Sequence, residues 1–192
     1  GEEVPELDRP EQQLELDTSR LIPINLSSAN SEDKTELDAW SFLFGRNLFD
    51  LKTEEEAPFY LCKEGRFTDR VIIPFTSDEG VVYYFQARAL YDQEPKCLNP
   101  STEIAPKPSD ILYPYDEDAD YVVVCEGPLD ARALQLQGVN ATATIGSSIS
   151  PRQAEILSTF AGTIILGYDN DTAGQRGIEK FDRTRKEMRM GS

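Results

Sequence analysis

Three short apolar runs in the last third of the chain, separated by helical patterns, restrict its possible folds more than any other feature. The runs cover residues 121–125, 141–145 and 163–168, and the first is continuously apolar. Continuous apolar strands are typical of sheets that are covered on both faces, as parallel sheets are. Pro128 and the sequence Ser150-Pro-Arg-Gln153 mark the first turns of the two intervening helices. This alternation predicts a parallel sheet with right-handed crossovers, in which ligands bind beyond the carboxyl ends of the strands.

The residues before this alternation predict a smaller unit of mixed composition. Runs at 59–62, 70–75 and 81–88 have strand composition, and turn-like residues join the last two as a hairpin. Pro74 indicates a strand end or a sheet edge. We therefore predict an α/β fold in three parts. These are an acidic linker or tail with one short helix (1–57), an α+β subdomain (58–118), and a Rossmann-like subdomain (119–192) whose last helix covers 172–188.

Four carboxylates follow the strands of the predicted parallel sheet. Glu126 comes directly after the first strand and Asp130 lies in the next helical turn, whereas Asp169 and Asp171 follow the third strand. Clustered carboxylates repel one another unless a cation is bound or their pKa values rise. The chain has no histidine, so an all-oxygen site favours Mg²⁺, with Mn²⁺ as a substitute, over Zn²⁺. Either acidic stretch alone is also typical of a helix N-terminus, so the prediction depends on the pair.

The charge balance and the cysteine content exclude several classes of protein. The net charge is −16, which does not suit an autonomous DNA-binding protein whose affinity comes from neutralising phosphates. Any nucleic-acid role would need a local basic patch, a bound metal or a partner. The three cysteines lack a C-x-x-C spacing, so we expect no zinc here, and their odd number favours a reducing compartment. No run reaches transmembrane length and no signal peptide is visible, so we expect a cytoplasmic protein without a membrane partner.

The two acidic stretches, taken together, resemble a known family. Glu126-Gly-Pro-Leu-Asp130 and Asp169-Asn-Asp-Thr-Ala-Gly174 are similar to the glutamate motif and the D-x-D motif of the Toprim domain, which primases, topoisomerases and certain nucleases share. Four upstream stretches resemble the N-terminal half of a DnaG-type primase core, which topoisomerases and Toprim nucleases lack. They are Arg70–Phe75, Tyr84–Leu90, Pro95–Asn99 and Ile111–Tyr113. The Phe-Gln-Ala-Arg-Ala-Leu version of the second stretch is most similar to T4-like bacteriophage primases.

The resemblance implies a Mg²⁺-dependent DNA primase that makes short RNA primers during replication. Glu126, Asp130, Asp169 and Asp171 would hold the metal, and Glu126 would also act as the acid or base beside the catalytic Asp169 and Asp171. Five further residues would face the single-stranded DNA template and the ribonucleoside triphosphates, and of these Lys107 matches the family only after a one-residue gap. They are Arg70, Arg88, Lys96, Asn99 and Lys107. Implied partners are a replicative helicase and a zinc-binding module of the same full-length protein, in a bacterium or a phage-infected host.

Two departures from the family pattern keep other functions open. Family members carry a third acidic element after a further strand, and they begin with a zinc module; we expect both to lie outside this chain, with residues 1–57 as the linker from that module. A Toprim nuclease or topoisomerase-like enzyme is one alternative, although the upstream basic residues argue against it. The other is a non-catalytic Toprim scaffold that binds DNA or a replisome partner, which the acidic charge favours.

Overall fold

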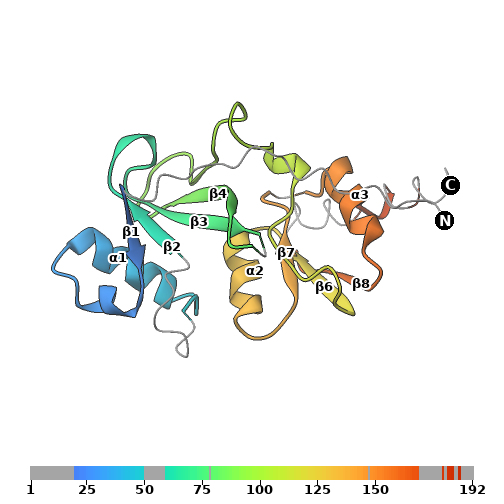
Figure 1. Cartoon of the computed structure of the whole chain (residues 1–192), viewed down its shortest axis with the longest axis horizontal. Coiled ribbons are helices and arrows are strands. Elements are labelled where there is room, and N and C mark those ends of the chain that lie inside the picture. The colour runs from blue at the N-terminus through green and yellow to red at the C-terminus, as the bar shows by residue number, and fades with distance from the viewer. Residues whose placement is uncertain are drawn as a thin grey trace.

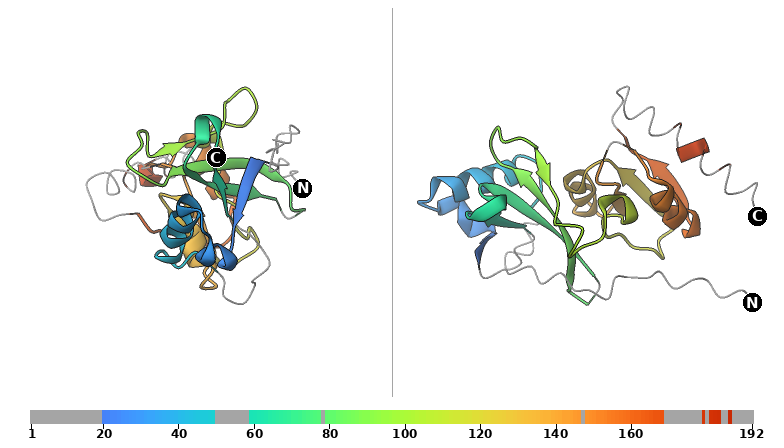
Figure 2. Two further views of the ribbon diagram at one scale, coloured as in Figure 1. Left: turned by 90° about the vertical axis from the view of Figure 1, so that its left-hand side faces the viewer. Right: turned by 90° about the horizontal axis from the view of Figure 1, so that it is seen from above.

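The computed structural model describes residues 20–49, 59–77, 79–146, 148–168, 179, 181–183 and 186. These residues form two sheets that lie next to each other along the long axis of the molecule (Figure 1). Viewed from above, α1 lies with the antiparallel sheet at one end and α3 with the parallel sheet at the other (Figure 2). Within the described ranges, no helix combines the length and the apolar character that a membrane span requires.

The antiparallel sheet has five strands in the order β1-β2-β3-β4-β5. The strands β3 and β4 form the predicted hairpin, with Arg70 opposite Ala89 and Phe75 opposite Tyr84. Helix α1 begins after Asp33, whose carboxylate accepts hydrogen bonds from the first-turn N–H groups of Thr35 and Glu36, as an N-cap residue does. The elements of this part are β1 (Leu21–Ile24), η2 (Leu26–Asn30), α1 (Lys34–Phe44), β2 (Phe59–Cys62), η3 (Gly65–Phe67), β3 (Arg70–Thr76), β4 (Val82–Ala89), β5 (Cys97–Leu98) and η4 (Pro108–Asp110).

The parallel sheet that the alternating pattern predicted is confirmed. It has the strand order β7-β6-β8, and both neighbours of β6 run parallel to it. The central strand is apolar throughout because both of its faces are covered: Val122 and Val124 pack with Leu157 of α3, whereas Cys125 packs with Ala131 of α2. The elements are β6 (Tyr121–Cys125), α2 (Pro128–Gln135), β7 (Ala141–Ala143), α3 (Pro151–Thr159) and β8 (Thr163–Leu166). The predicted third helix, at 172–188, lies largely outside the described residues.

The prediction that residues 1–57 are only a linker or tail with one helix is wrong for their described part. Strand β1 forms the edge of the antiparallel sheet, with Ile24 opposite Phe59 of β2. Ile24 and Leu43 are fully buried in the main hydrophobic core. The four-residue strand Leu-Ile-Pro-Ile is too short to show a period, and its proline is tolerated because an edge strand has one unpaired side. Only pairing with β2, which lies far along the chain, makes this segment a strand.

The prediction for Pro74 holds only in part. Pro74 was expected at a strand end or a sheet edge, yet it lies inside β3, an inner strand. Among the described residues, the pairing of β2 with β3 stops at Ile72, and Pro74 pairs with Phe85 of β4. The missing N–H of Pro74 is therefore tolerated because β3 is locally an edge at this point.

One hydrophobic core connects the two sheets. Phe75, at the far end of β3, packs edge-on against Tyr113 with ring centroids 4.9 Å apart, and both belong to the cluster that contains Cys125 and Ala131. The connecting segment 108–121 is fastened to the parallel sheet by buried or half-buried polar side chains. Gln153 donates to the carbonyl oxygens of Pro108, Ile111 and Thr144, and Gln135 donates to those of Pro114 and Ala141. Asn140 donates to the carbonyl oxygens of Asp116 and Tyr121, and Thr142 donates to that of Tyr113.

Candidate active site

The carboxyl end of β6 places the first acidic stretch at the edge of the parallel sheet. Glu126 follows the last residue of β6, Gly127 is the N-cap residue of α2, and Asp130 lies in its first turn. An added Cβ on Gly127 would lie 2.9 Å from Asp130 Oδ2. Glycine therefore lets the Asp130 carboxylate fold back over the strand–helix turn. The prediction that both acids lie at the carboxyl edge of the sheet is confirmed for these two residues.

The negative charges of Glu126 and Asp130 raise the pKa values of two neighbouring side chains. Burial raises the pKa of the Cys125 thiol to about 11, and the negative charge of Asp130 adds to this shift. Burial also raises the pKa of the Tyr168 phenol to about 12; its hydrogen bond with Thr144 opposes the shift, and the charge of Glu126 adds to it. Because Tyr168 follows β8 and Glu126 follows β6, the ends of these two strands share one electrostatic environment.

The backbone at the end of β7 closes around Glu126. The Thr144 N–H donates to the carbonyl oxygen of Cys125 (3.1 Å), and the Gly146 N–H donates to that of Glu126 (3.2 Å). Ile145, between them, has a φ of 62°, a left-handed conformation that costs a β-branched residue on the order of 1–3 kcal/mol. Backbone strain of this kind is retained where surrounding contacts determine it, and it concentrates at functional sites.

Thr144 and Tyr168 are residues of this edge that the sequence did not single out. Their side-chain oxygens lie 2.9 Å apart, and Thr144 also donates to the carbonyl oxygen of Gly146 (2.8 Å). The pair joins the end of β7 to the end of β8. Its only sequence signal is that each residue comes at the end of a predicted strand, which is too common a feature to single out a residue.

The described part of the site fits a hard divalent cation in its donor chemistry. Glu126 and Asp130 supply only oxygen, and Oε1 of Glu126 is buried, which suits Mg²⁺ or Mn²⁺. Asp169 and Asp171, the other two predicted ligands, lie outside the described residues. Among the residues that are described, no three His, Cys, Asp or Glu side chains group closely enough to hold a metal ion. The four-carboxylate site therefore stays a prediction.

The predicted template- and nucleotide-binding residues come from the antiparallel sheet and the segment after it. Lys96 is exposed just before β5, and Lys107 is exposed at the N-cap of η4. Asn99 is half-buried after β5, and Arg88 of β4 is half-buried with its Nη1 3.6 Å from Cys97 Sγ. Arg70 differs from the others because only 3% of it is exposed. Its guanidinium donates to the carbonyl oxygens of Lys96 and Ala87.

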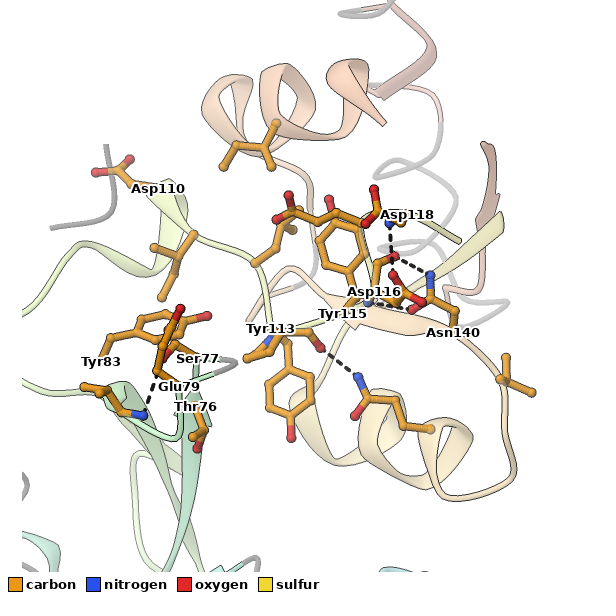
Figure 3. A pocket seen from close by; sticks show the side chains of 18 of the residues that line it. Thr76, Ser77, Glu79, Tyr83, Asp110, Tyr113, Tyr115, Asp116, Asp118 and Asn140 are labelled. Atoms are coloured by element: carbon orange, nitrogen blue, oxygen red, sulfur yellow. Dashed lines mark hydrogen bonds between the residues drawn. The ribbon is translucent and has the colours of Figure 1, made fainter. Parts of the chain in front are cut away.

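A groove of about 1170 Å³ lies between the far end of the β3–β4 hairpin and the segment 110–118. Five acidic residues line it, of which Figure 3 labels Glu79, Asp110, Asp116 and Asp118. Its aromatic surface comes from Tyr83, Tyr113 and Tyr115. The same view shows Asn140 hydrogen-bonded to Asp116. None of the predicted site residues lines this groove, so we do not assign the groove to the chemistry of the sheet edge.

Comparison with known proteins agrees with the geometry. Residues 123–190 match the family model described as Toprim-like. The chain is 34% identical over 128 residues to a DNA primase of Clostridium acetobutylicum, which covers 63% of this chain and 22% of the relative. It is 36% identical over 123 residues to a DNA primase of Thermotoga maritima, covering 60% of this chain and 22% of that relative. The chain thus spans about a fifth of the length of these relatives.

Solved structures show the same fold. The E. coli primase catalytic core superposes with a TM-score of 0.59 at 22% identity, covering 81% of this chain and 62% of that one. A DnaG primase catalytic domain solved bound to single-stranded DNA also gives 0.59 at 22% identity, with 81% and 61% covered. These similarities confirm the predicted combination of a parallel sheet and a preceding α+β unit with a β-hairpin, although the antiparallel sheet of that unit, with five strands, is larger than predicted. The chain carries a Toprim-like domain and has the fold of the DnaG-type primase catalytic core.

Proposed function

We propose that this chain is the RNA-polymerising part of a DNA primase, which joins ribonucleoside triphosphates into short primers on a single-stranded DNA template. The observation that carries the proposal is the combination of two features in one fold. Glu126 and Asp130 stand at the carboxyl edge of the Toprim-like sheet, and the antiparallel unit before it carries Arg88, Lys96 and Asn99, in a chain that is similar to DNA primases. A nuclease or topoisomerase reading accounts for the acids but not for this upstream unit.

The proposed reaction is an in-line transfer of a nucleotidyl group. The 3′-hydroxyl of one nucleotide attacks the α-phosphorus of the next, a new P–O bond forms, and the bond to the bridging oxygen breaks with release of pyrophosphate. Glu126 would take the hydroxyl proton, and Lys96, Arg88, Asn99 and Lys107 would bind the triphosphate and the template phosphates. Mg²⁺ held by Glu126, Asp130, Asp169 and Asp171 would supply charge neutralisation for the phosphate oxygens. We also propose that the protein is cytoplasmic, that it works with a replicative helicase and a zinc-binding module, and that it is most similar to T4-like phage primases.

The test is primer synthesis from labelled ribonucleotides on single-stranded DNA with Mg²⁺. We expect oligoribonucleotides from the wild-type chain and none from Asp169→Ala, whereas Glu155→Gln, an exposed acid on α3, should behave as wild type. Cleavage of DNA without synthesis would instead support the nuclease alternative. The scaffold alternative would be supported if the chain bound the template but neither made primers nor bound Mg²⁺, even after a zinc-binding module was added.

A glycine substitution tests the geometry of the first acidic stretch. In Gly127→Ala the new Cβ would lie 2.9 Å from Asp130 Oδ2, so the carboxylate must move while the backbone keeps its ordinary negative φ of −114°. We expect roughly tenfold slower primer synthesis, because small misplacements of a catalytic group slow the reaction strongly, with little change in the unfolding midpoint. Gly45→Ala, at the end of α1, is the matched control and should synthesise primers normally. Unchanged synthesis by Gly127→Ala would contradict a role for Asp130.

A further inference from the structure

Arg70 begins β3, yet its side chain does not reach solvent. The residue is 3% exposed, and Nη1 donates to the carbonyl oxygen of Lys96 at 3.2 Å and to that of Ala87 at 3.5 Å. A buried guanidinium needs acceptors for its fork of N–H groups, because a buried charge without partners is strongly unfavourable. Here main-chain carbonyls supply two of those acceptors, and one of them belongs to a predicted substrate-binding residue.

Besides the packing of Leu98 on the sheet and the contact of Arg88 with Cys97, the segment that contains Lys96 is held to the sheet by a short ladder of backbone bonds. Strand β5 is only two residues long and pairs with β4 through Ala87 with Leu98 and Arg88 with Cys97. One further bond runs from the Ala89 N–H to the carbonyl oxygen of Lys96 (2.8 Å). A two-residue edge strand is marginal by itself, and hydrogen bonds from a charged donor are about twice as strong as neutral ones. Arg70 therefore adds a charge-assisted hydrogen bond that acts directly on the backbone at Lys96.

We propose that Arg70 is a positioning residue. It holds the main chain at Lys96 so that the exposed Lys96 ammonium meets its anionic partner, and Arg70 itself does not contact template or nucleotide. This inference rests on the proposed function, because Lys96 is assigned there to phosphate binding. It replaces, for Arg70 alone, the direct substrate contact that the family resemblance implies. Arginine suits the role because Nη1 carries two N–H groups that the planar guanidinium holds in fixed directions, so that one nitrogen can donate to both carbonyl oxygens.

A double-mutant cycle separates the positioning role from direct contact. Arg70→Met and Lys96→Ala are each expected to raise the KM for ribonucleotides and the Kd for a fluorescent single-stranded DNA by roughly tenfold, the size of one lost charged contact. If Arg70 acts through Lys96, the double variant should be less than about threefold worse than Lys96→Ala alone. Effects that multiply would show that Arg70 binds substrate independently, and would overturn the proposal.

Hydrogen exchange tests the same inference without any activity. In Arg70→Met, the amides of Cys97, Leu98 and Ala89 should exchange faster, whereas those of α2 and α3 should keep their wild-type rates. Gln135→Met is the matched control, because it also removes two bonds to main-chain carbonyls, those of Pro114 and Ala141. It should leave KM, Kd and the exchange of residues 96–98 unchanged. Unchanged exchange rates at residues 96–98 in Arg70→Met would refute the positioning role of Arg70.

A conservative variant and the activity of the wild-type chain complete the test of Arg70. Arg70→Lys, which keeps the charge and places all its donors on one nitrogen, should give intermediate exchange rates and an intermediate KM. If Arg70→Met does not fold, Arg70→Lys and its combination with Lys96→Ala take its place in the cycle. If the wild-type chain neither makes primers nor binds single-stranded DNA, the proposed function fails. The exchange measurement would in that case still decide whether Arg70 holds the segment.

Discussion

Replacing Glu126 by glutamine is expected to lower the rate of primer synthesis by roughly 10²–10⁴-fold, the range that a general acid or base supplies. The substitution keeps the shape of the side chain but removes its charge and its ability to accept a proton. Glu126 is held between the ends of three strands: the Gly146 N–H binds its carbonyl oxygen, and its charge acts on Tyr168 after β8. A neutral amide at this place also weakens the attraction for a divalent cation, so Mg²⁺ should bind more weakly.

The measurement is single-turnover primer extension together with calorimetric titration of Mg²⁺. Glu155→Gln makes the same chemical change on the exposed face of α3, where Glu155 forms an ion pair with the exposed Arg152 (2.7 Å). We expect it to behave as wild type, because exposed ion pairs of this kind contribute little to stability. The unfolding midpoint of Glu126→Gln should stay close to that of the wild type. If Glu126→Gln makes primers at the wild-type rate and binds Mg²⁺ equally well, the catalytic assignment of the sheet edge is wrong.

Replacing Gln153 by methionine is expected to lower the free energy of unfolding by about 3–4 kcal/mol. Gln153 is 1% exposed at the start of α3. Its amide donates to the carbonyl oxygens of Pro108 (3.0 Å), Ile111 (2.8 Å) and Thr144 (2.8 Å), and its oxygen accepts from the Ser150 N–H (3.0 Å). Methionine fills a similar volume but leaves these buried or half-buried groups without this partner, and the loss costs about 1–3 kcal/mol for a fully buried group. We take a value below the sum because relaxation and water recover part of it.

Urea unfolding followed by circular dichroism checks this expectation. Gln137→Met is the matched control, because Gln137 is exposed after α2, and its midpoint should change little. A loss of less than about 1 kcal/mol in Gln153→Met would show that the segment 108–111 is held mainly by apolar packing. Since small domains are stable by only about 5–15 kcal/mol in total, the expected loss is large enough to measure directly.

The sequence was sufficient for the parts of the fold that local rules determine. The apolar run 121–125 predicted a strand covered on both faces, and Ser150-Pro-Arg-Gln153 predicted the start of α3, where Ser150 and Gln153 form the capping box. The positions of Glu126 and Asp130 followed from the rule that parallel strands end at one edge of a sheet. The same reasoning included Asp169 and Asp171, which lie outside the described residues, so the complete set of ligands stays a prediction.

Local rules failed where a residue's role depends on a partner far along the chain. Gln153 was expected only to cap its own helix, yet it also reaches segments 42 and 45 residues away in sequence. The pair of Thr144 and Tyr168 spans 24 residues. No periodicity or composition encodes such contacts, because they form only when segments that are distant in sequence come together around the parallel sheet.

The sequence by itself determined the parallel sheet, the hairpin before it and the placement of Glu126 and Asp130 at the sheet edge, because these follow from strand period, capping and strand direction. Only the tertiary structure decided that residues 21–24 form an edge strand and that the Arg70 guanidinium is buried beneath the backbone of Lys96. The physical reason is the same in both cases. An edge pairing and a buried charge are stable only in the presence of acceptors and donors that distant residues supply, and the chain brings those together only when it folds.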